Sequence, residues 1–231
     1  MQILADACNR TIPKLDCAAN NISNIHTAGY KTERVNYPVD QPESVKEGTL
    51  VDPYIFVDYS QGTLEATGNS LDLAIEGEGF FVIQTKEGEA YTRKGTFTLN
   101  RNNEVVTQNG DYLLGESGKI ALTGSDVVIT AKGEIQVGGN KIGKLKMVNF
   151  DKPQALVKTG NGLCIDNGTA GIKLQDKSTV RSGSLERSNV DSIKEMLAMI
   201  DIQRTIEIYQ KNIQSISEQD KLSTGRIGRL V

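Results

Sequence analysis

Residues 190–216 read VDSIKEMLAMIDIQRTIEIYQKNIQSI, and the spacing of their apolar side chains predicts one long amphipathic helix. A first apolar group recurs at steps of three and four residues, and a second group repeats these heptad-like steps after a change of register. Because the register changes, the helix carries apolar residues on more than one face and needs two partners. Ser188 or Asn189 is expected to cap its start, with Asp191 in the first turn. We predict an assembly interface from both groups: Ile193, Leu197 and Ile200, then Ile202, Ile206, Tyr209, Ile213 and Ile216.

A second amphipathic helix is predicted at the other end of the chain, from Met1 to about Ala28. Pro13 is expected to kink or break it near its start, because proline lacks a backbone donor and clashes with the preceding turn. Gly29 is expected to stop the helix at a positive φ. The side chains that this helix is predicted to add to the assembly interface are Ile12, Leu15, Ile22 and Ile25.

The middle of the chain changes from irregular to β-rich sequence. Residues 30–62 contain three prolines and read as an extended connector. Beyond them, short apolar or alternating runs are separated by glycine-containing turns, which is typical of antiparallel strands. Gly138-Gly139 between two such runs predicts a tight hairpin. The expected strands are Leu71–Ile75, Phe80–Gln84, Thr96–Leu99, Val127–Thr130, Glu134–Val137 and Leu145–Phe150.

Together these zones predict an α+β fold. The N- and C-terminal helices, residues 1–29 and 188–222, are expected to pair as a coiled-coil-like domain. Residues 63–187 are expected to form a central all-β domain, as an antiparallel sheet or small barrel, and residues 223–231 a tail. Isolated helices of this kind are marginal in water, so we expect both ends to be disordered in the free monomer and to fold on assembly.

The composition argues against several kinds of partner and site. The net charge of −3 and the absence of a basic run argue against a nucleic-acid partner. Three cysteines without metal-type spacing predict neither a disulfide framework nor a metal site. No apolar run approaches the roughly 18 residues of a membrane span. Asp6, Asn9 and Arg10 interrupt the apolar run that a signal peptide needs, so we expect no cleaved signal peptide.

No pattern in the chain predicts catalysis or a cofactor. His26, the single histidine, lies in a segment that ends a helix, where a surface or capping role is favoured. The carboxylates Asp72, Glu76 and Glu78 are interpreted as solvated strand and turn charges. Gly77 and Gly79 precede a strand-like run, so a tight corner is favoured over a dinucleotide site. We therefore predict a protein that is not an enzyme and has no small-molecule substrate.

Four ordered motifs resemble one known family. Residues 20–31, NNISNIHTAGYK, resemble the N-terminal signature of the bacterial flagellar basal-body rod and hook proteins, N-N-[LI]-[AS]-N followed by T-x-G-[FY]-[KR]. Residues 71–81 (LDLAIEGEGFF), 90–97 (AYTRKGTF) and 184–190 (SLERSNV) are similar to later motifs of that family, and Met199 and Gln203-Arg204 lie where its last helix carries M-I-x-x-Q-R. The signature residues are Asn20, Asn21, Asn24, Thr27, Gly29, Tyr30 and Lys31.

The resemblance implies a structural subunit of the periplasm-spanning rod that transmits torque from motor to hook. It implies a homo-oligomeric helical array, other rod proteins above and below it, and export through the flagellar type III apparatus. The short connector favours a proximal-rod subunit over a distal-rod one. The alternatives from other classes are a soluble β-domain binding module, which lacks a tryptophan platform, and a hydrolase, which lacks a nucleophile and base.

Overall fold

The computed structural model describes residues 2–37, 53–124, 127–174 and 178–227, and it divides into two compact units. The first unit is built from Met1–Ser23, Glu33–Asp58 and Val190–Val231, and the second from Asn24–Thr32 and Tyr59–Asn189. Each unit is described by itself. The sequence-based domain boundaries stay a prediction.

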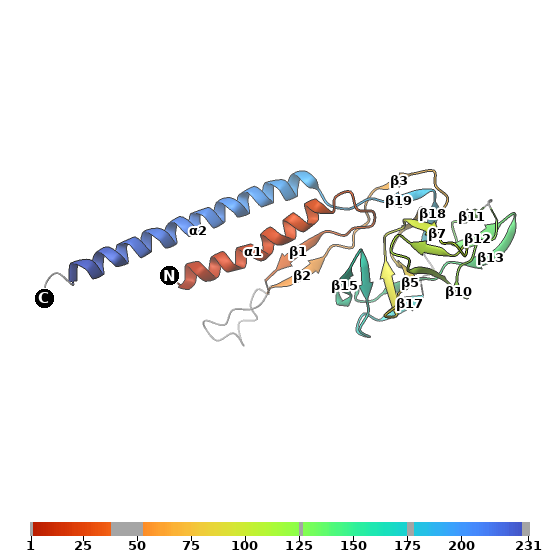
Figure 1. Ribbon diagram of the computed structural model, residues 1–231, viewed down its shortest axis with the longest axis horizontal. Helices are drawn as coiled ribbons and strands as arrows, with labels where there is room; N and C mark the ends of the chain where they lie inside the picture. The colour runs from red at the N-terminus through yellow and green to blue at the C-terminus, as the bar shows by residue number, and fades with distance from the viewer. Residues whose placement is uncertain (1, 38–52, 125–126, 175–177, 228–231) are drawn as a thin grey trace. The chain divides into compact units, whose positions relative to one another are not determined.

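The first unit contains two helices and a two-stranded sheet. Helix α1 (Gln2–Ser23) and helix α2 (Ser192–Ile227) run side by side in opposite directions (Figure 1). Strands β1 (Glu33–Asn36) and β2 (Tyr54–Val57) pair antiparallel and lie along α1 on the side away from α2 (Figure 1). Helix α1 continues through Pro13, so the expected break is absent, and it ends at Ser23 rather than Ala28. Neither described helix is long and apolar enough to cross a membrane.

The predicted fold class is wrong. The described residues contain only two α-helices and are organised mostly as β-sheet, and the helices do not form the expected coiled-coil-like domain. A coiled-coil seam would bury the first apolar group of α2, yet Ile193, Leu197 and Ile200 are 69%, 57% and 44% exposed. The periodicity correctly identified apolar helix faces, but it did not determine which face another element covers.

The start of α2 also differs from the expectation. The capping residue is Asp191, not Ser188 or Asn189: its Oδ1 accepts hydrogen bonds from the backbone N–H groups of Ile193 and Lys194. These bonds, together with the Lys194 side chain, lower the pKa of the Asp191 carboxyl.

The second unit is the expected central β domain, and all its strand pairs are antiparallel. Its largest sheet has the order β15-β16-β6-β5-β9-β8-β7, with β10 on β9 and β14 joining β5 to β17. Smaller sheets are β11-β12-β13, β18-β4 and β19-β3. The expected hairpin at Gly138-Gly139 is confirmed between β12 and β13, with φ values of +57° and +82°. The strands are β3 (Leu64–Ala66), β4 (Leu73–Glu76), β5 (Phe80–Gln84), β6 (Glu89–Thr92), β7 (Phe97–Leu99), β8 (Val105–Thr107), β9 (Tyr112–Gly115), β10 (Gly118–Lys119), β11 (Val127–Ile129), β12 (Glu134–Val137), β13 (Asn140–Lys144), β14 (Met147–Phe150), β15 (Val157–Gly160), β16 (Leu163–Ile165), β17 (Ile172–Leu174), β18 (Thr179–Ser182) and β19 (Ser184–Glu186), with a 3-10 turn at Pro153–Ala155.

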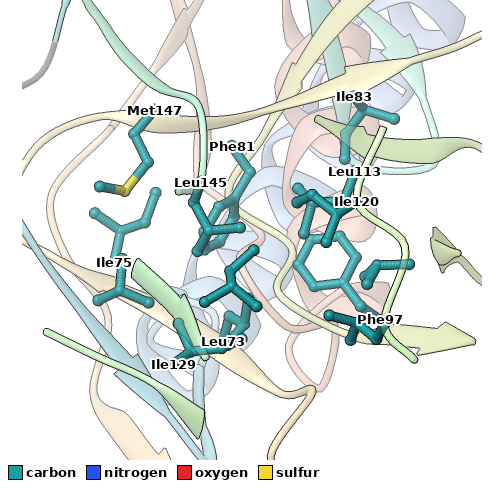
Figure 2. Packing of buried hydrophobic residues seen from close by; sticks show 14 residues of the cluster. Leu73, Ile75, Phe81, Ile83, Phe97, Leu113, Ile120, Ile129, Leu145 and Met147 are labelled. Atoms are coloured by element: carbon teal, nitrogen blue, oxygen red, sulfur yellow. The ribbon is translucent and has the colours of Figure 1, made fainter. Parts of the chain in front are cut away.

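Strand β5 organises the core of this unit because both of its faces are buried. Phe81 and Ile83 join one apolar cluster, in which they pack with side chains such as Phe97 and Leu113 (Figure 2). Phe80 and Val82 join a second cluster on the opposite face. A continuous apolar run is what a strand buried on both faces requires. The tight corner expected before it is confirmed by positive φ at Gly77 (+103°) and Gly79 (+123°).

Candidate functional site

The most polar buried site of the second unit is centred on Glu186, at the end of β19. Its carboxylate is fully buried, and Oε1 accepts hydrogen bonds from Lys31 Nζ at 2.6 Å and from the backbone N–H of Gly62 at 2.9 Å. Oε2 faces Arg93 Nη1 at 3.3 Å. A buried carboxylate needs such partners, since losing its hydration without them costs several kcal/mol. We call the group Lys31, Arg93, Glu186 and Asn189 the junction.

Arg93 and Lys31 bind more than Glu186. Arg93 Nη2 donates to the carbonyl oxygen of Gly77 at 2.7 Å, and its guanidinium lies 5.6 Å from the Phe80 ring centre. Burial lowers the pKa of the Arg93 guanidinium, and the Glu186 carboxylate opposes that shift. Lys31 Nζ also donates to the carbonyl oxygen of Ser60 at 2.6 Å. Each cation therefore links Glu186 to a second segment of chain.

Asn189 connects the points where the chain passes between units. Its Oδ1 accepts hydrogen bonds from the backbone N–H and the hydroxyl of Thr32, both at 2.8 Å. Its Nδ2 donates to the carbonyl oxygen and the hydroxyl of Ser60 at 3.1 and 3.0 Å. Thr32, Ser60 and Asn189 each lie within two residues of a passage from one unit to the other. One side chain thus ties three connecting segments together.

Glycines allow backbones to meet at this site. Gly29 has φ +69°, as the sequence predicted, and its N–H donates to the carbonyl oxygen of Glu186 at 2.7 Å. A Cβ on Gly29 would lie 2.4 Å from the carbonyl carbon of Arg93. A Cβ on Gly95 would lie 1.5 Å from the carbonyl oxygen of Leu73. No side chain fits at either position without moving backbone.

The asparagines of the signature fix the turn after α1. In the first unit, Asn21 is 1% exposed; its Nδ2 donates to the Glu33 carbonyl oxygen and its Oδ1 accepts from the Glu33 N–H, as a paired strand would. Asn20 Nδ2 donates to the Glu33 carboxylate at 3.1 Å. In the second unit, Asn24 Oδ1 accepts from the Thr27 hydroxyl at 3.1 Å. The hydrogen bonds of these amides hold the turn in which the chain changes direction after α1, as expected for the motif.

The remaining predicted residues separate into two groups. Within α2, the later apolar group is half-buried, whereas the earlier group is exposed. From α1, Leu15, Ile22 and also Ile25 just beyond it are half-buried, while Ile12 is 44% exposed. Tyr30 lies with its ring 5.0 Å from Lys158 Nζ. The sequence assigned no role to Arg93 and Glu186, and it considered Asn189 only as a cap for the last helix, although all three lie in the motifs. The charges of Arg93 and Glu186 within those motifs were the available signal.

The contacts of the junction hold segments of the chain together. Its acid and its two cations are paired with one another, and its amide binds Thr32 and Ser60. Three or more metal-binding side chains do not gather anywhere in the described ranges. The β unit and the junction define a class: a β-rich protein whose connecting segments are tied together by buried ion pairs and hydrogen bonds.

Comparisons with known proteins identify the family. Residues 74–137 match the family described as flagellar hook protein FlgE/F/G D1 domain, and residues 181–223 match flagellar basal body rod FlgEFG protein C-terminal. The chain is 31% identical over 227 positions to the flagellar basal-body rod protein FlgF of Caulobacter vibrioides, covering 94% of this chain and 93% of that one. It is 32% identical over 243 positions to FlgG of Bacillus subtilis, covering 90% of each chain.

The chain belongs to the flagellar basal-body rod protein family of FlgF and FlgG type. It is therefore a structural subunit of the flagellar rod, located at the basal body, and it assembles with other rod components. The prediction that it is not an enzyme is confirmed by this membership, because the family is a structural one.

Proposed function

We propose that this chain is the proximal-rod subunit, of FlgF rather than FlgG type. The observation that carries the proposal is the short connector between residues 30 and 62. The alignment with Bacillus subtilis FlgG supports it, because that alignment runs to 243 positions although this chain has 231 residues. FlgG therefore carries segments that this chain lacks, whereas the alignment with Caulobacter FlgF needs 227 positions.

The junction suits a subunit that carries torque. Torque on a rod loads the covalent connections between the units of each subunit. The connections are held by hydrogen bonds among Asn189, Thr32 and Ser60. Glu186 is in turn held by ion pairs with two cations of the β unit. A clamp of this kind keeps the connecting segments from pulling out of the β unit under load.

Assembly is proposed to use the helical unit. Ile193, Leu197 and Ile200 are apolar side chains on one helix face that is exposed in the single chain. Covering a fully exposed Leu or Ile side chain contributes roughly 1.5–3 kcal/mol. We assign this face to contact with further copies in a helical, periplasm-spanning array. Export is proposed to occur through the flagellar type III apparatus without a cleaved signal peptide.

Genetic complementation tests the proximal assignment. The chain is expressed in a strain deleted for its own FlgF and in a matched strain deleted for FlgG. We expect motility to return in the first strain alone, with the chain present in purified basal bodies. Motility restored only in the FlgG-deleted strain would assign the chain to the distal rod instead.

A further inference from the structure

Two apolar surfaces of the first unit are uncovered. The first lies at the beginning of α2, where Ile193, Met196, Leu197 and Ile200 are between 44% and 69% exposed. At 100° per residue these four side chains share one helix face, opposite the face of Ile202 and Ile206. We call them the outer stripe.

The second uncovered surface is a groove between α1 and the β1–β2 sheet. It has a volume of about 420 Å³ and is lined by Pro13 and Cys17 of α1 and by Val35 and Ile55 of the sheet, among others. Ile55 is paired with Val35 across the strands, but its side chain remains 61% exposed. An apolar groove of this size bordered by an exposed Ile lacks an occupant within the described part of the unit.

The groove and the outer stripe lie on opposite sides of the same unit. Pro13, Cys17 and Asn20 recur at helical spacing and line the groove. Leu15, Ala18 and Ile22 recur at helical spacing on the other face of α1. Helix α2 runs along α1 on the side away from β1 and β2 (Figure 1). The outer stripe points away from α1 on the far side of α2. It cannot reach the groove of its own chain, but it can reach the groove of another copy.

The charges beside the two surfaces are complementary. Asp16 and Glu33 lie at the groove. Arg204 and Lys211 follow the outer stripe on the same face of α2, one and three turns beyond Ile200, with the exposed Glu207 between them. Asp16, Arg204 and Lys211 are exposed, and no ion pair involves them within the described residues. Arg204, the first charged residue after the outer stripe on this face, can therefore pair with the acidic groove margin.

We propose that the outer stripe of one copy occupies the α1–β1 groove of the next copy, with Arg204 beside Asp16. This inference rests on the proposed assembly role and gives that role a specific contact. Because the two surfaces differ and lie on opposite sides, the contact is head-to-tail and leaves one stripe and one groove free at the ends. Repetition of such a contact builds an open array rather than a closed dimer.

Cross-linking between two tagged versions of the full chain tests the contact. One version carries Ile55→Cys and the other Leu197→Cys, both in a Cys8→Ser, Cys17→Ser background, since Cys17 lines the groove and Cys164 is buried. We expect an oxidised heterodimer of the two tags, in assembled protein and in isolated basal bodies. In the matched control, Ala198→Cys replaces Leu197→Cys on an exposed position turned away from the stripe. The control should yield at least about tenfold less product.

A charge exchange supplies an independent measurement. Asp16→Arg and Arg204→Asp should each weaken self-association about tenfold, because each places like charges together at the contact. The double exchange should restore it, which a mere loss of stability would not do. Equal cross-linking with Ala198→Cys, no cross-link, or no restoration would overturn the inference. If those results occur in a chain that still enters rods, only this contact fails; a chain that enters no rod contradicts the proposed function itself.

Discussion

At the scale of single residues, the motifs that define the family converge on one buried ion-pair group. Lys31 comes from the first motif, Gly77 from the second, Arg93 from the third, and Glu186 and Asn189 from the fourth. Thr32 and Asn189, which are 157 positions apart in sequence, meet at hydrogen-bond distance. Residues from all four motifs therefore form the junction.

Replacing Glu186 tests how much the junction contributes to stability. Glu186→Gln keeps the shape of the side chain but leaves Lys31 and Arg93 buried without their carboxylate. We expect the free energy of unfolding of the β unit to fall by about 3–5 kcal/mol, as for a broken buried ion pair. Urea denaturation measures it. Glu65→Gln, which removes an exposed carboxylate paired with Arg187, is the control and should leave the midpoint unchanged. An equal effect from both substitutions would contradict the role given to Glu186.

Two glycine substitutions distinguish the stability cost of a left-handed backbone conformation from the cost of a close contact with another backbone segment. Gly29 and Gly68 have similar φ values, +69° and +78°, but only Gly29 has backbone within 4 Å of an added Cβ. Gly68→Ala should cost about 1–2 kcal/mol of stability from the left-handed conformation alone. Gly29→Ala should cost clearly more, because the Arg93 backbone must move. Thermal unfolding compares the two, and equal losses would show that the close approach is relieved cheaply.

At the scale of elements, helix α2 has two apolar faces with different surroundings. The face of Ile202 and Ile206 is half-buried in its own unit, whereas the outer stripe is exposed. The helix begins at the Asp191 cap, whose hydrogen bonds satisfy two otherwise unpaired N–H groups. Its start is thus set by a local side chain, and its outer face depends on assembly.

The cap gives α2 a pH dependence with a definite sign. The pKa of Asp191 is lower in the folded chain than its usual 3.8, so the ionised carboxyl stabilises the helix at neutral pH. That contribution is fully present above the unfolded pKa and is lost as the pH falls through the folded pKa. Circular dichroism between pH 6 and about pH 2 should show a loss of helix that Asp191→Asn reduces. An identical pH profile in Asp191→Asn would show that the Asp191 cap does not cause the loss of helix at low pH.

At the scale of the whole molecule, the β unit includes a segment from far before its first strand in the sequence. Asn24–Thr32 belongs to the β unit and supplies Gly29 and Lys31 to the junction. The unit that folds by itself is thus expected to need this segment.

Two fragments test that expectation. Residues 24–189 retain the junction, whereas residues 63–187 lose Lys31, the Gly62 N–H and Asn189. The shorter fragment should be less stable by about 3–5 kcal/mol, because Glu186 loses Lys31 and the Gly62 N–H while remaining buried. Thermal unfolding followed by circular dichroism compares them, with Lys31→Met in the longer fragment as a matched control. Equal melting temperatures would place the stabilising contacts outside the junction.

Hydrogen exchange on the free monomer tests the coupling of the helices to assembly. Amides of α1 and α2 should exchange much faster than those of β5, because the outer stripe and groove are uncovered before copies meet. In assembled protein the helices should become protected. Strong protection of both helices in the monomer would contradict the expectation that the ends order on assembly.

The sequence predicted much of the β unit and the family. Strand β5, the Gly138-Gly139 hairpin and the positive φ of Gly29 were evident from apolar runs and glycine placement, because these features depend on neighbouring residues. The fold class failed at the helices, since a periodic pattern shows that a face is apolar without showing what covers it. Helix α1 also passes through Pro13, where local chemistry favoured a break.

By itself, therefore, the sequence determined where several strands and turns of the β unit and both amphipathic helices form, and its motifs identified the flagellar rod family. Only the tertiary structure brought Lys31, Arg93 and Glu186 together, and only it separated a half-buried face of α2 from an exposed one. The physical reason is the sequence separation over which each kind of interaction acts. Periodicity and turn chemistry act over a few residues, whereas a buried charge is stabilised by whichever distant segment the fold places beside it.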